Sequence, residues 1–304
     1  MHHKPKTIFF YLKEFMPIGD SKEQFFTENC SLVFIKILRA SCCGRYFSVI
    51  QFFGRLRWWK EKLSYICRIK CESNMKLTAL IVAGGSGTRF GAAVPKQFVE
   101  LCGTPVLMRT VGRFQESGVC SHMIVVLPEG QIGQWQELCR KHGFDIPHQV
   151  VAGGDTRFQS VKNGLAAMTI EPGDLVAVHD GVRPLVLPAD IKMAFEAAAE
   201  HGSAVPMAHF PYSDSLRQML PDGSTHPIDR GSLRVVLTPQ VFDAVALRKA
   251  YEVPFDPRFT DDATVYEAAG HTIHPVEGNL DNLKITRAAD LARAEAILKQ
   301  QQND

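Results

Sequence analysis

The chain has 304 residues, of which 45% are hydrophobic and 22% are charged, as expected of a soluble protein with one large core or two smaller ones. Disorder, collagen and repeat arrays are excluded as the main architecture. The net charge of +2 combines two unlike parts: residues 1–74 hold 13 Lys and Arg against 6 Asp and Glu, whereas residues 75–304 hold 21 against 26.

The first 74 residues do not have the pattern of a folded domain. Aromatic pairs such as Phe9-Phe10 and Trp58-Trp59 fall without sustained helical or strand periodicity. The apolar stretch 31–38 is interrupted by Lys36 and is far shorter than the ~20 residues that a membrane span needs. We expect Met75 to be the native start and the preceding residues to be a translated leader or the product of a mis-called start. The alternative is a basic amphipathic segment that contacts a membrane or nucleic acid.

The cysteines indicate a reducing compartment. Only Cys102, Cys120 and Cys139 follow Met75, and no CxxC pair occurs anywhere in the chain. These spacings support neither a zinc site nor a disulfide framework. We therefore expect a cytoplasmic protein. For residues 75–304 we expect neither a membrane nor a nucleic acid as a partner.

From Met75 onward, short apolar strands alternate with helical segments. Segments bounded by Gly, Pro or Asp predict strands over 77–82, 123–127, 149–152, 175–179 and 204–208. Apolar residues at three and four spacing predict helices over 106–116, 132–142, 157–168 and 189–201. Asp155 or Thr156 would cap the third helix. The alternation predicts an α/β fold with a single Rossmann-like, mostly parallel sheet covered on both faces.

The alternation breaks at about Pro211. Residues 212–235 are rich in Ser, Asp, Gly, Pro and Arg and lack the pattern of a buried strand, so we expect a projecting arm at about 211–235. The regular pattern resumes over 241–251. After it we expect a helix over 262–269, strands over 272–276 and 282–286, and a closing helix over 288–298. One α/β domain over 75–304, with an arm, fits this order best.

The first strand of this domain runs directly into Ala83-Gly84-Gly85-Ser86-Gly87-Thr88-Arg89. Ligands of open α/β folds bind at this carboxyl edge of the sheet. Glycine lets the backbone N–H groups approach phosphate oxygens closely, and Arg89 and Lys96 add positive charge. The segment predicts a triphosphate-binding loop. The simpler alternative is a glycine-rich turn with two surface cations.

Two common nucleotide loops are excluded by spacing. The Walker A loop requires Gly immediately before Lys, whereas Pro95 precedes Lys96. A dinucleotide fingerprint that starts at Gly85 would require Gly at the position of Phe90. The sequence therefore supports neither an ATPase of that type nor a dehydrogenase.

The loop, together with Pro95-Lys96-Gln97-Phe98, resembles the nucleotidyltransferases, most closely the 2-C-methyl-D-erythritol 4-phosphate cytidylyltransferases of isoprenoid biosynthesis. The resemblance covers about residues 76–298. Further blocks agree with that family in order: Gly153-Gly154-Asp155-x-Arg157-x-x-Ser160, His179-Asp180-Gly181-Val182-Arg183-Pro184, Asp229-Arg230, Leu237-Thr238-Pro239-Gln240, Thr260-Asp261-Asp262 and Asp281-Asn282-Leu283-Lys284-Ile285-Thr286.

The resemblance implies transfer of CMP from CTP to 2-C-methyl-D-erythritol 4-phosphate, with release of pyrophosphate. A phosphate monoester is already anionic near neutral pH, so positioning and charge neutralisation can carry this reaction without a general base. The residues implied as catalytic are Arg89, Lys96, Arg230 and Lys284.

The resemblance also implies the binding residues. The CTP site would be formed by Ala83, Gly84, Gly85, Gly87, Gly153, Asp155, Ser160, Asp180 and Gly181, of which Gly153, Asp155 and Ser160 would recognise cytosine. Asp180 and Asp281 would hold Mg²⁺, which prefers oxygen ligands. The acceptor substrate would contact Arg183, Ser215, Arg230, Thr238, Thr260 and Lys284. Arg230 and Ser215 resemble family residues that reach across a homodimer, so an exchange of arms is implied.

Simpler interpretations exist for single positions. Asp180 could be a strand-end cap, Asp281 a turn residue, and Gly153-Gly154-Asp155 a turn with a helix cap. Thr238-Pro239 could begin a helix, and Thr260-Asp261 could cap one. We expect His179 to be a packed, hydrogen-bonded residue rather than a catalytic one.

Two other functions compete with this one. A ribitol 5-phosphate cytidylyltransferase would share the loop and differ mainly in its acceptor. A non-catalytic nucleotide-binding module would be expected to have replaced at least one of Arg89, Lys96, Asp180 or Lys284, all of which are present. Three departures from the family pattern are Gly181 for Ala, Ser215 for Thr and Leu280 for a polar residue.

Overall fold

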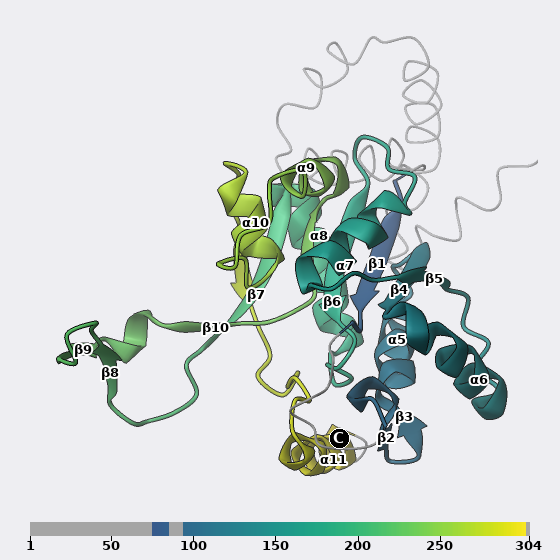
Figure 1. Cartoon of the computed structure of the whole chain (residues 1–304), viewed down its shortest axis with the longest axis horizontal. Helices are drawn as coiled ribbons and strands as arrows, with labels where there is room; N and C mark the ends of the chain where they lie inside the picture. Colours follow the sequence, from purple (N-terminus) through teal and green to yellow (C-terminus); the bar gives the residue numbers. More distant parts are fainter. Residues whose placement is uncertain (1–74, 85–93, 302–304) are drawn as a thin grey trace, which may run out of the picture. The chain divides into compact units, whose positions relative to one another are not determined.

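The computed structural model describes residues 75–84 and 94–301, drawn as ribbon in Figure 1. The predictions that concern residues 1–74, and those for Gly85, Gly87 and Arg89, lie outside the described residues. None of the helices described here has both the length and the apolar character needed to cross a membrane.

The centre of the described chain is an eight-stranded sheet with the order β10-β7-β11-β6-β1-β4-β5, in which β12 also pairs with β7. Strands β1, β4, β5 and β6 are mutually parallel, whereas β11 is antiparallel to both β6 and β7. Strand β10 is antiparallel and β12 parallel to β7. The strands are β1 (Leu77–Val82), β4 (His122–Leu127), β5 (Gln149–Ala152), β6 (Leu175–Asp180), β7 (Ser203–His209), β10 (Arg234–Val236), β11 (Gln240–Asp243) and β12 (Pro275–Glu277).

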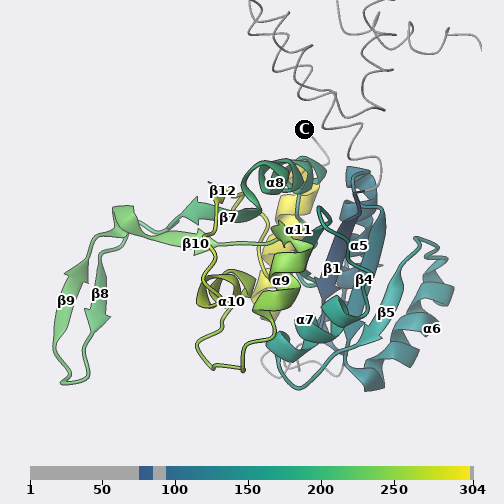
Figure 2. The ribbon, with the colours of Figure 1, turned by 90° about the horizontal axis from the view of Figure 1, so that it is seen from above.

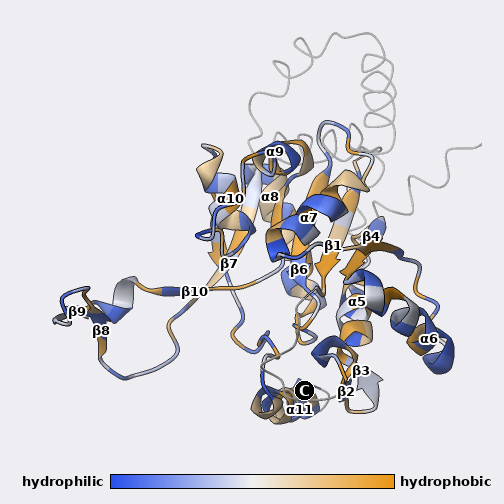
Figure 3. Ribbon diagram, in the orientation of Figure 1, coloured by the Kyte–Doolittle hydropathy of each residue, from blue (hydrophilic) through white to orange (hydrophobic). Residues whose placement is uncertain are grey.

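The sheet is hydrophobic on both faces because helices cover both (Figure 3). Alternate residues of β1 belong to different cores, with Ala79 and Ile81 on one face and Leu80 and Val82 on the other. The helices are α5 (Val106–Ser117), α6 (Ile132–His142), α7 (Arg157–Ala166), α8 (Pro188–His201), α9 (Ala244–Ala250), α10 (Asp262–Ala268) and α11 (Ala288–Gln301).

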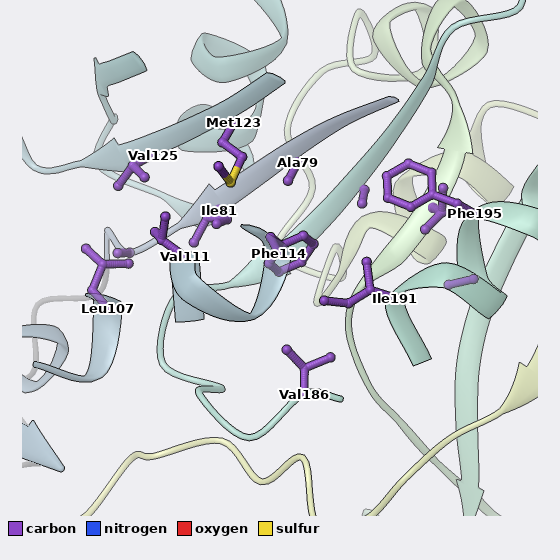
Figure 4. Packing of buried hydrophobic residues seen from close by; sticks show 14 of the residues in the cluster. Ala79, Ile81, Leu107, Val111, Phe114, Met123, Val125, Val186, Ile191 and Phe195 are labelled. Atoms are coloured by element: carbon purple, nitrogen blue, oxygen red, sulfur yellow. The ribbon is translucent and has the colours of Figure 1, made fainter. Parts of the chain in front are cut away.

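On the first face, α5 and α8 pack against the centre of the sheet. Phe114 and Val111 of α5 lie beside Ile81 of β1, and Ile191 and Phe195 of α8 continue the same apolar layer (Figure 4). The opposite face is packed by α7, α9 and α10. A third cluster joins α11 to the loop that follows β6. This third cluster fixes the loop that carries much of the site described below.

Most of the expected elements are confirmed. Strands β1 and β5 and helix α6 have the predicted bounds, and Thr156 caps α7 by accepting a hydrogen bond from the N–H of Gln159. The mostly parallel α/β sheet is confirmed as well, although its β11 and β10 run antiparallel to their neighbours.

The strand expected over 282–286 is wrong. Its backbone groups have other partners: the N–H of Ile285 donates to the carbonyl of Val182, and the carbonyl of Asn282 accepts from the guanidinium of Arg183. Ile285 is buried in the third cluster rather than in a sheet. The strand expected over 272–276 is present but begins later, at Pro275. Thr238-Pro239 does not begin a helix, because β11 follows directly from Gln240.

The arm is present as a hairpin of β8 (Leu216–Met219) and β9 (Thr225–Ile228), a two-stranded sheet separate from the main one. It extends away from the helices and strands of the main sheet in Figure 2. Neither strand buries a residue, so no face needs a regular apolar alternation, and the sequence pattern could not indicate a strand.

Candidate functional site

The predicted site lies where parallel strands end. Ala83 and Gly84 follow β1, Gly153 follows β5, and Asp180 is the last residue of β6. Two hydrogen bonds join these ends: the N–H of Ala83 donates to Val126 of β4, and the N–H of Gly181 donates to Val82 of β1. Because these strands are parallel, their carboxyl ends share one edge of the sheet.

Close packing explains three of the glycines at this edge. A Cβ on Gly153 would lie 2.8 Å from Ser160 Oγ, and one on Gly84 would lie 3.1 Å from it. A Cβ on Gly181 would lie 2.9 Å from the Cβ of Ala83. The turns after β1, β5 and β6 therefore approach as closely as they do only because these side chains are absent.

Ser160 is buried, and its hydroxyl is used by the backbone. It accepts from the N–H of Gly154 at 3.1 Å and donates to the carbonyl of Thr156 at 2.9 Å. The structure thus places Ser160 beside Gly153, as a residue that fixes the Gly153-Gly154-Asp155 turn. Asp155 is exposed at the tip of that turn.

Lys96 stands in a short 3-10 helix, η1 (Lys96–Phe98), and is half-buried. The neighbouring Gln97 is fully buried and donates from its amide to the carbonyl of Ala83 at 3.1 Å. Gln97 therefore ties the segment that carries Lys96 to the end of β1. In the sequence, Gln97 is part of the Pro95-Lys96-Gln97-Phe98 block, and nothing in that pattern indicates this role.

Asp180 is the centre of a cluster of cations. Its Oδ2 lies 3.0 Å from Lys284 Nζ and 3.2 Å from Arg183 Nε, and its Oδ1 lies 3.5 Å from Arg157 Nε. The side chain of Asp180 is only 10% exposed. Burial alone would raise the pKa of this carboxyl, but the three cations lower it well below its usual range. Asp180 is therefore an ionised carboxylate, and not the simple strand-end cap considered from the sequence.

The loop after β6 holds Arg183 in place. Its side chain is 10% exposed, and its Nη1 donates to the carbonyl of Asn282 at 2.8 Å. Asn282 in turn donates from its amide to the carbonyl of Thr238 at 2.6 Å. Three segments, carrying Asp180, Thr238 and Lys284, are thereby joined. They are far apart in the sequence, which is why no local pattern places them together.

Thr238 and His179 support the same loop from behind. Thr238 is buried, and its hydroxyl contacts His179 Nδ1 at 3.0 Å and accepts from the N–H of Asp180 at 3.3 Å. His179 is fully buried and its Nε2 contacts the carbonyl of Arg183. The expectation that His179 is a packed residue is confirmed.

Arg157, which sequence reasoning quoted but assigned no function, links Asp180 to a second carboxylate. Its Nη2 and Nη1 lie 2.6 and 3.1 Å from the two oxygens of Asp262. The hydroxyl of Tyr251 donates to the same Asp262 at 2.6 Å. In the sequence, the one indication of a role for Arg157 and Asp262 is that both lie inside blocks that resemble the family.

The remaining predicted residues lie away from this cluster or on the surface. Ser215 and Arg230 belong to the exposed arm segment, where the guanidinium of Arg230 donates to the carbonyl of Ser213. Thr260 is exposed just before α10, whose N-cap is Asp261 in a capping box. Asp281 is exposed in a turn, and its N–H donates to Asn279 Oδ1.

One residue at this edge of the sheet, Asp180, has the carboxylate oxygens that magnesium prefers as ligands. The cations around Asp180 favour its ionised form, and its Oδ1 contacts Arg157 Nε at the longer distance of 3.5 Å. Magnesium is commonly held by one or two carboxylates together with substrate phosphates and waters. No group of three or more His, Cys, Asp or Glu occurs in the described ranges that could hold a metal ion without such substrate oxygens.

A glycine-lined edge of a mostly parallel sheet, with a buried carboxylate among three cations, is the arrangement expected of an α/β protein that handles nucleotide phosphates. The comparisons with known proteins place it more narrowly. Residues 77–300 match the family model of 2-C-methyl-D-erythritol 4-phosphate cytidylyltransferase. The chain belongs to this family of nucleotidyltransferase enzymes.

Relatives and solved structures agree with this assignment. The chain is 46% identical over 221 residues to the 2-C-methyl-D-erythritol 4-phosphate cytidylyltransferase of Bacteroides fragilis, covering 73% of this chain and 99% of that protein. It is 46% identical over 224 residues to the enzyme of that name from Porphyromonas gingivalis, covering 73% and 98%. The crystal structure of the enzyme of that name from Thermus thermophilus matches with a TM-score of 0.56 and 30% identity, covering 74% and 100%.

Proposed function

We propose that this chain transfers CMP from CTP to 2-C-methyl-D-erythritol 4-phosphate, which forms 4-diphosphocytidyl-2-C-methyl-D-erythritol and pyrophosphate. The observation that carries the proposal is the Asp180 cluster at the carboxyl edge of the sheet, with Lys284 Nζ 3.0 Å and Arg183 Nε 3.2 Å from one oxygen. The match to cytidylyltransferases over residues 77–300 supports it.

The chemistry needs no proton acceptor. A phosphate oxygen of the acceptor attacks the α-phosphorus of CTP, the bond from that phosphorus to the bridging oxygen breaks, and pyrophosphate leaves with the electron pair. The attacking phosphate is already anionic near neutral pH, so the protein contributes position and positive charge. Lys284, whose side chain is 40% exposed, can turn from Asp180 toward an incoming phosphate. Arg183 is held more firmly and fixes Asp180 itself.

On the CTP side, Lys96 and Arg89 would bind the triphosphate. Gln97 anchors the Lys96 segment to Ala83 at the end of β1, where the glycine turn begins. The turn of Gly153, Gly154 and Asp155, fixed by Ser160, would bind the cytosine edge through its backbone and through Asp155. Magnesium, held by Asp180 and by phosphate oxygens with Asp281 as a further candidate, would neutralise charge on the triphosphate.

The arm completes the site in this proposal. Tyr212 and Met219 are 59% and 67% exposed along it, and exposed apolar side chains in one segment favour a protein partner. We propose that the partner is a second copy of this chain, to whose site the arm delivers Arg230 and Ser215. Thr260 would contact the acceptor at the rim of the same site. A cytoplasmic location suits the free thiols of Cys102, Cys120 and Cys139.

The acceptor assay tests the proposed reaction. Pyrophosphate release from CTP and Mg²⁺ is measured with 2-C-methyl-D-erythritol 4-phosphate, with ribitol 5-phosphate and without acceptor. Release with the first substrate alone is expected. Fast release with the ribitol substrate alone would assign the other acceptor, and no release with either would favour a non-catalytic nucleotide-binding module. Lys284→Ala, measured in parallel, separates release by this site from release by a contaminant.

A further inference from the structure

Arg157 is placed between two carboxylates with different surroundings. Its fork, Nη1 and Nη2, makes a bidentate pair with Asp262, whereas its contact with Asp180 is through Nε, at the longer distance of 3.5 Å. The side chain of Asp262 is fully buried and that of Arg157 is 27% exposed. Burial alone would lower the pKa of Arg157, but Asp262 and then Asp180 raise it well above its ordinary value.

Asp262 is held by more than Arg157. The hydroxyl of Tyr251, a residue only 2% exposed, donates to Asp262 Oδ1 at 2.6 Å. Asp262 is also the first residue of α10, whose cap at Asp261 fixes its backbone. A buried carboxylate is retained only where such donors satisfy it. Here both oxygens receive charged or short hydrogen bonds.

The charges show what Asp262 changes at the site. Arg157, Arg183 and Lys284 all contact Asp180, and Arg157 is also paired with Asp262. Two carboxylates therefore share three cations, and without Asp262 all three cations would depend on Asp180 alone. Bidentate guanidinium–carboxylate pairs are the strongest of these contacts. An Arg157 without Asp262 would turn its fork to Asp180 and would compete there with Lys284, which is the most exposed of the three.

We propose that Asp262, held by Tyr251, is a positioning residue of the site: it keeps the fork of Arg157 away from Asp180, so that Asp180 stays paired with Lys284. This inference rests on the proposed function only for its effect on turnover. The pairing itself is a property of the free protein and is measured there.

The test measures how fast the amine of Lys284 is acylated, by brief labelling with acetic anhydride and mass spectrometry of the full chain after digestion. In Asp262→Asn we expect Lys284 to label about threefold faster or more, because an amine displaced from its ion pair with Asp180 is more accessible to the reagent. Under the proposed function, kcat falls about 10-fold because Lys284 is misplaced, while KM for CTP changes less.

The double variant Asp262→Asn with Arg157→Met distinguishes positioning from a general loss of structure. It removes the competing fork together with its partner, so Lys284 is expected to return to the wild-type labelling rate. If the double variant labels Lys284 as fast as Asp262→Asn does, or if Asp262→Asn does not change the rate, the inference is wrong. A protein without turnover but with the expected labelling would overturn the proposed function alone.

Two further variants complete the experiment. Tyr251→Phe keeps the ring and removes one hydrogen bond to Asp262, so it should accelerate Lys284 labelling, but by less than Asp262→Asn does. If Asp262→Asn does not fold, an unchanged labelling rate in Tyr251→Phe would show that the inference is wrong. Asp256→Asn removes the partner of Arg258, an exposed pair at 2.6 Å. This control should leave both Lys284 labelling and turnover at the wild-type values.

Discussion

His179 shows how fully one buried residue can be specified by its contacts. The carbonyl of Arg183 can only accept a hydrogen bond, so Nε2 of His179 carries the proton, and Nδ1 then accepts from the hydroxyl of Thr238. Thr238 in turn accepts from the N–H of Asp180. Every partner is satisfied by the neutral ring, and burial lowers the pKa of His179 to about 4.

This lowered pKa predicts a pH-dependent stability. In the unfolded chain a histidine takes up its proton below about pH 6.5, whereas folded His179 stays neutral until about pH 4. The unfolded state therefore binds more protons in this window, and stability falls as the pH is lowered through it, by up to about 3 kcal/mol from this residue. Above pH 6.5 the residue adds no pH dependence.

Urea unfolding at pH 7 and pH 5 measures the effect. His179→Asn should be less stable than the wild type at pH 7 and should lose less stability on acidification. The exposed His226 supplies the control, because His226→Asn should keep the wild-type dependence on pH. An equal loss of stability in wild type and His179→Asn would contradict the assignment.

Lys96 is the residue on which the triphosphate assignment depends most. Lys96→Ala is expected to lower kcat by ~10² or more, the scale for loss of one donor to a transition state. Steady-state kinetics with CTP and the acceptor checks this, and circular dichroism checks that η1 and the sheet remain intact. Unchanged turnover would mean that the loop binds something other than the triphosphate.

Among the elements, α7 packs tightly against the sheet at Gly164. A Cβ added to Gly164 would lie 2.4 Å from Leu80 Cδ1 in β1 and 3.1 Å from Val126 Cγ2 in β4. This approach brings the N-terminal end of α7, with Arg157 and Ser160, to the edge of the sheet. The spacing of α7 from the sheet is thus part of what places the site.

Gly164→Ala should therefore destabilise the fold by about 1–3 kcal/mol, because the new methyl group overpacks the contact. Gly112, in the middle of α5, is the matched control, since a Cβ there meets no described atom within 4 Å. Gly112→Ala should stabilise the protein by about 0.5–1 kcal/mol through helix propensity. Thermal unfolding of both variants is the measurement, and equal shifts would contradict the close packing of α7.

At the scale of the whole molecule, the arm is the segment whose strands take no part in the hydrophobic cores described above. Its strands bury nothing within this chain, and Tyr212 and Met219 are exposed along it. Arg230 and Ser215 lie on this segment and make no described contact with the Asp180 cluster. The proposed site shared between two copies would account for both observations.

Mixing two inactive variants tests the shared site. Lys284→Ala lacks a residue of the body and Arg230→Ala lacks one of the arm, so a mixed dimer would have one complete site. After unfolding and refolding together, the mixture should recover about one quarter of the wild-type activity, since random pairing makes half of the dimers mixed. Each variant refolded alone is the control. No recovery would mean that Arg230 acts within its own chain, and full activity of Arg230→Ala refolded alone would mean that it does not act at all.

The sequence alone was sufficient for features with a local cause. The period of apolar residues predicted β1, β5 and α6 with their observed bounds, and Thr156 was one of two residues named as the cap of α7. The glycine turn and the blocks around it indicated the family. The hairpin strands were missed because neither buries a residue, so neither shows an apolar alternation. The conformation of 282–286 was missed because its backbone partners, Val182 and Arg183, are distant in the chain.

Only the tertiary structure decided which charges meet. Arg157, Arg183 and Lys284 reach Asp180 from the start of α7, the loop after β6 and the segment before α11, and no periodicity records such an encounter. The structure also shows that the hydroxyls of Thr238 and Ser160 form hydrogen bonds with backbone groups of the site. It further shows that Arg157 is paired with Asp262. Hydrophobic patterns fix elements because they act between neighbours in sequence, whereas the balance of buried charges exists only after the elements have packed.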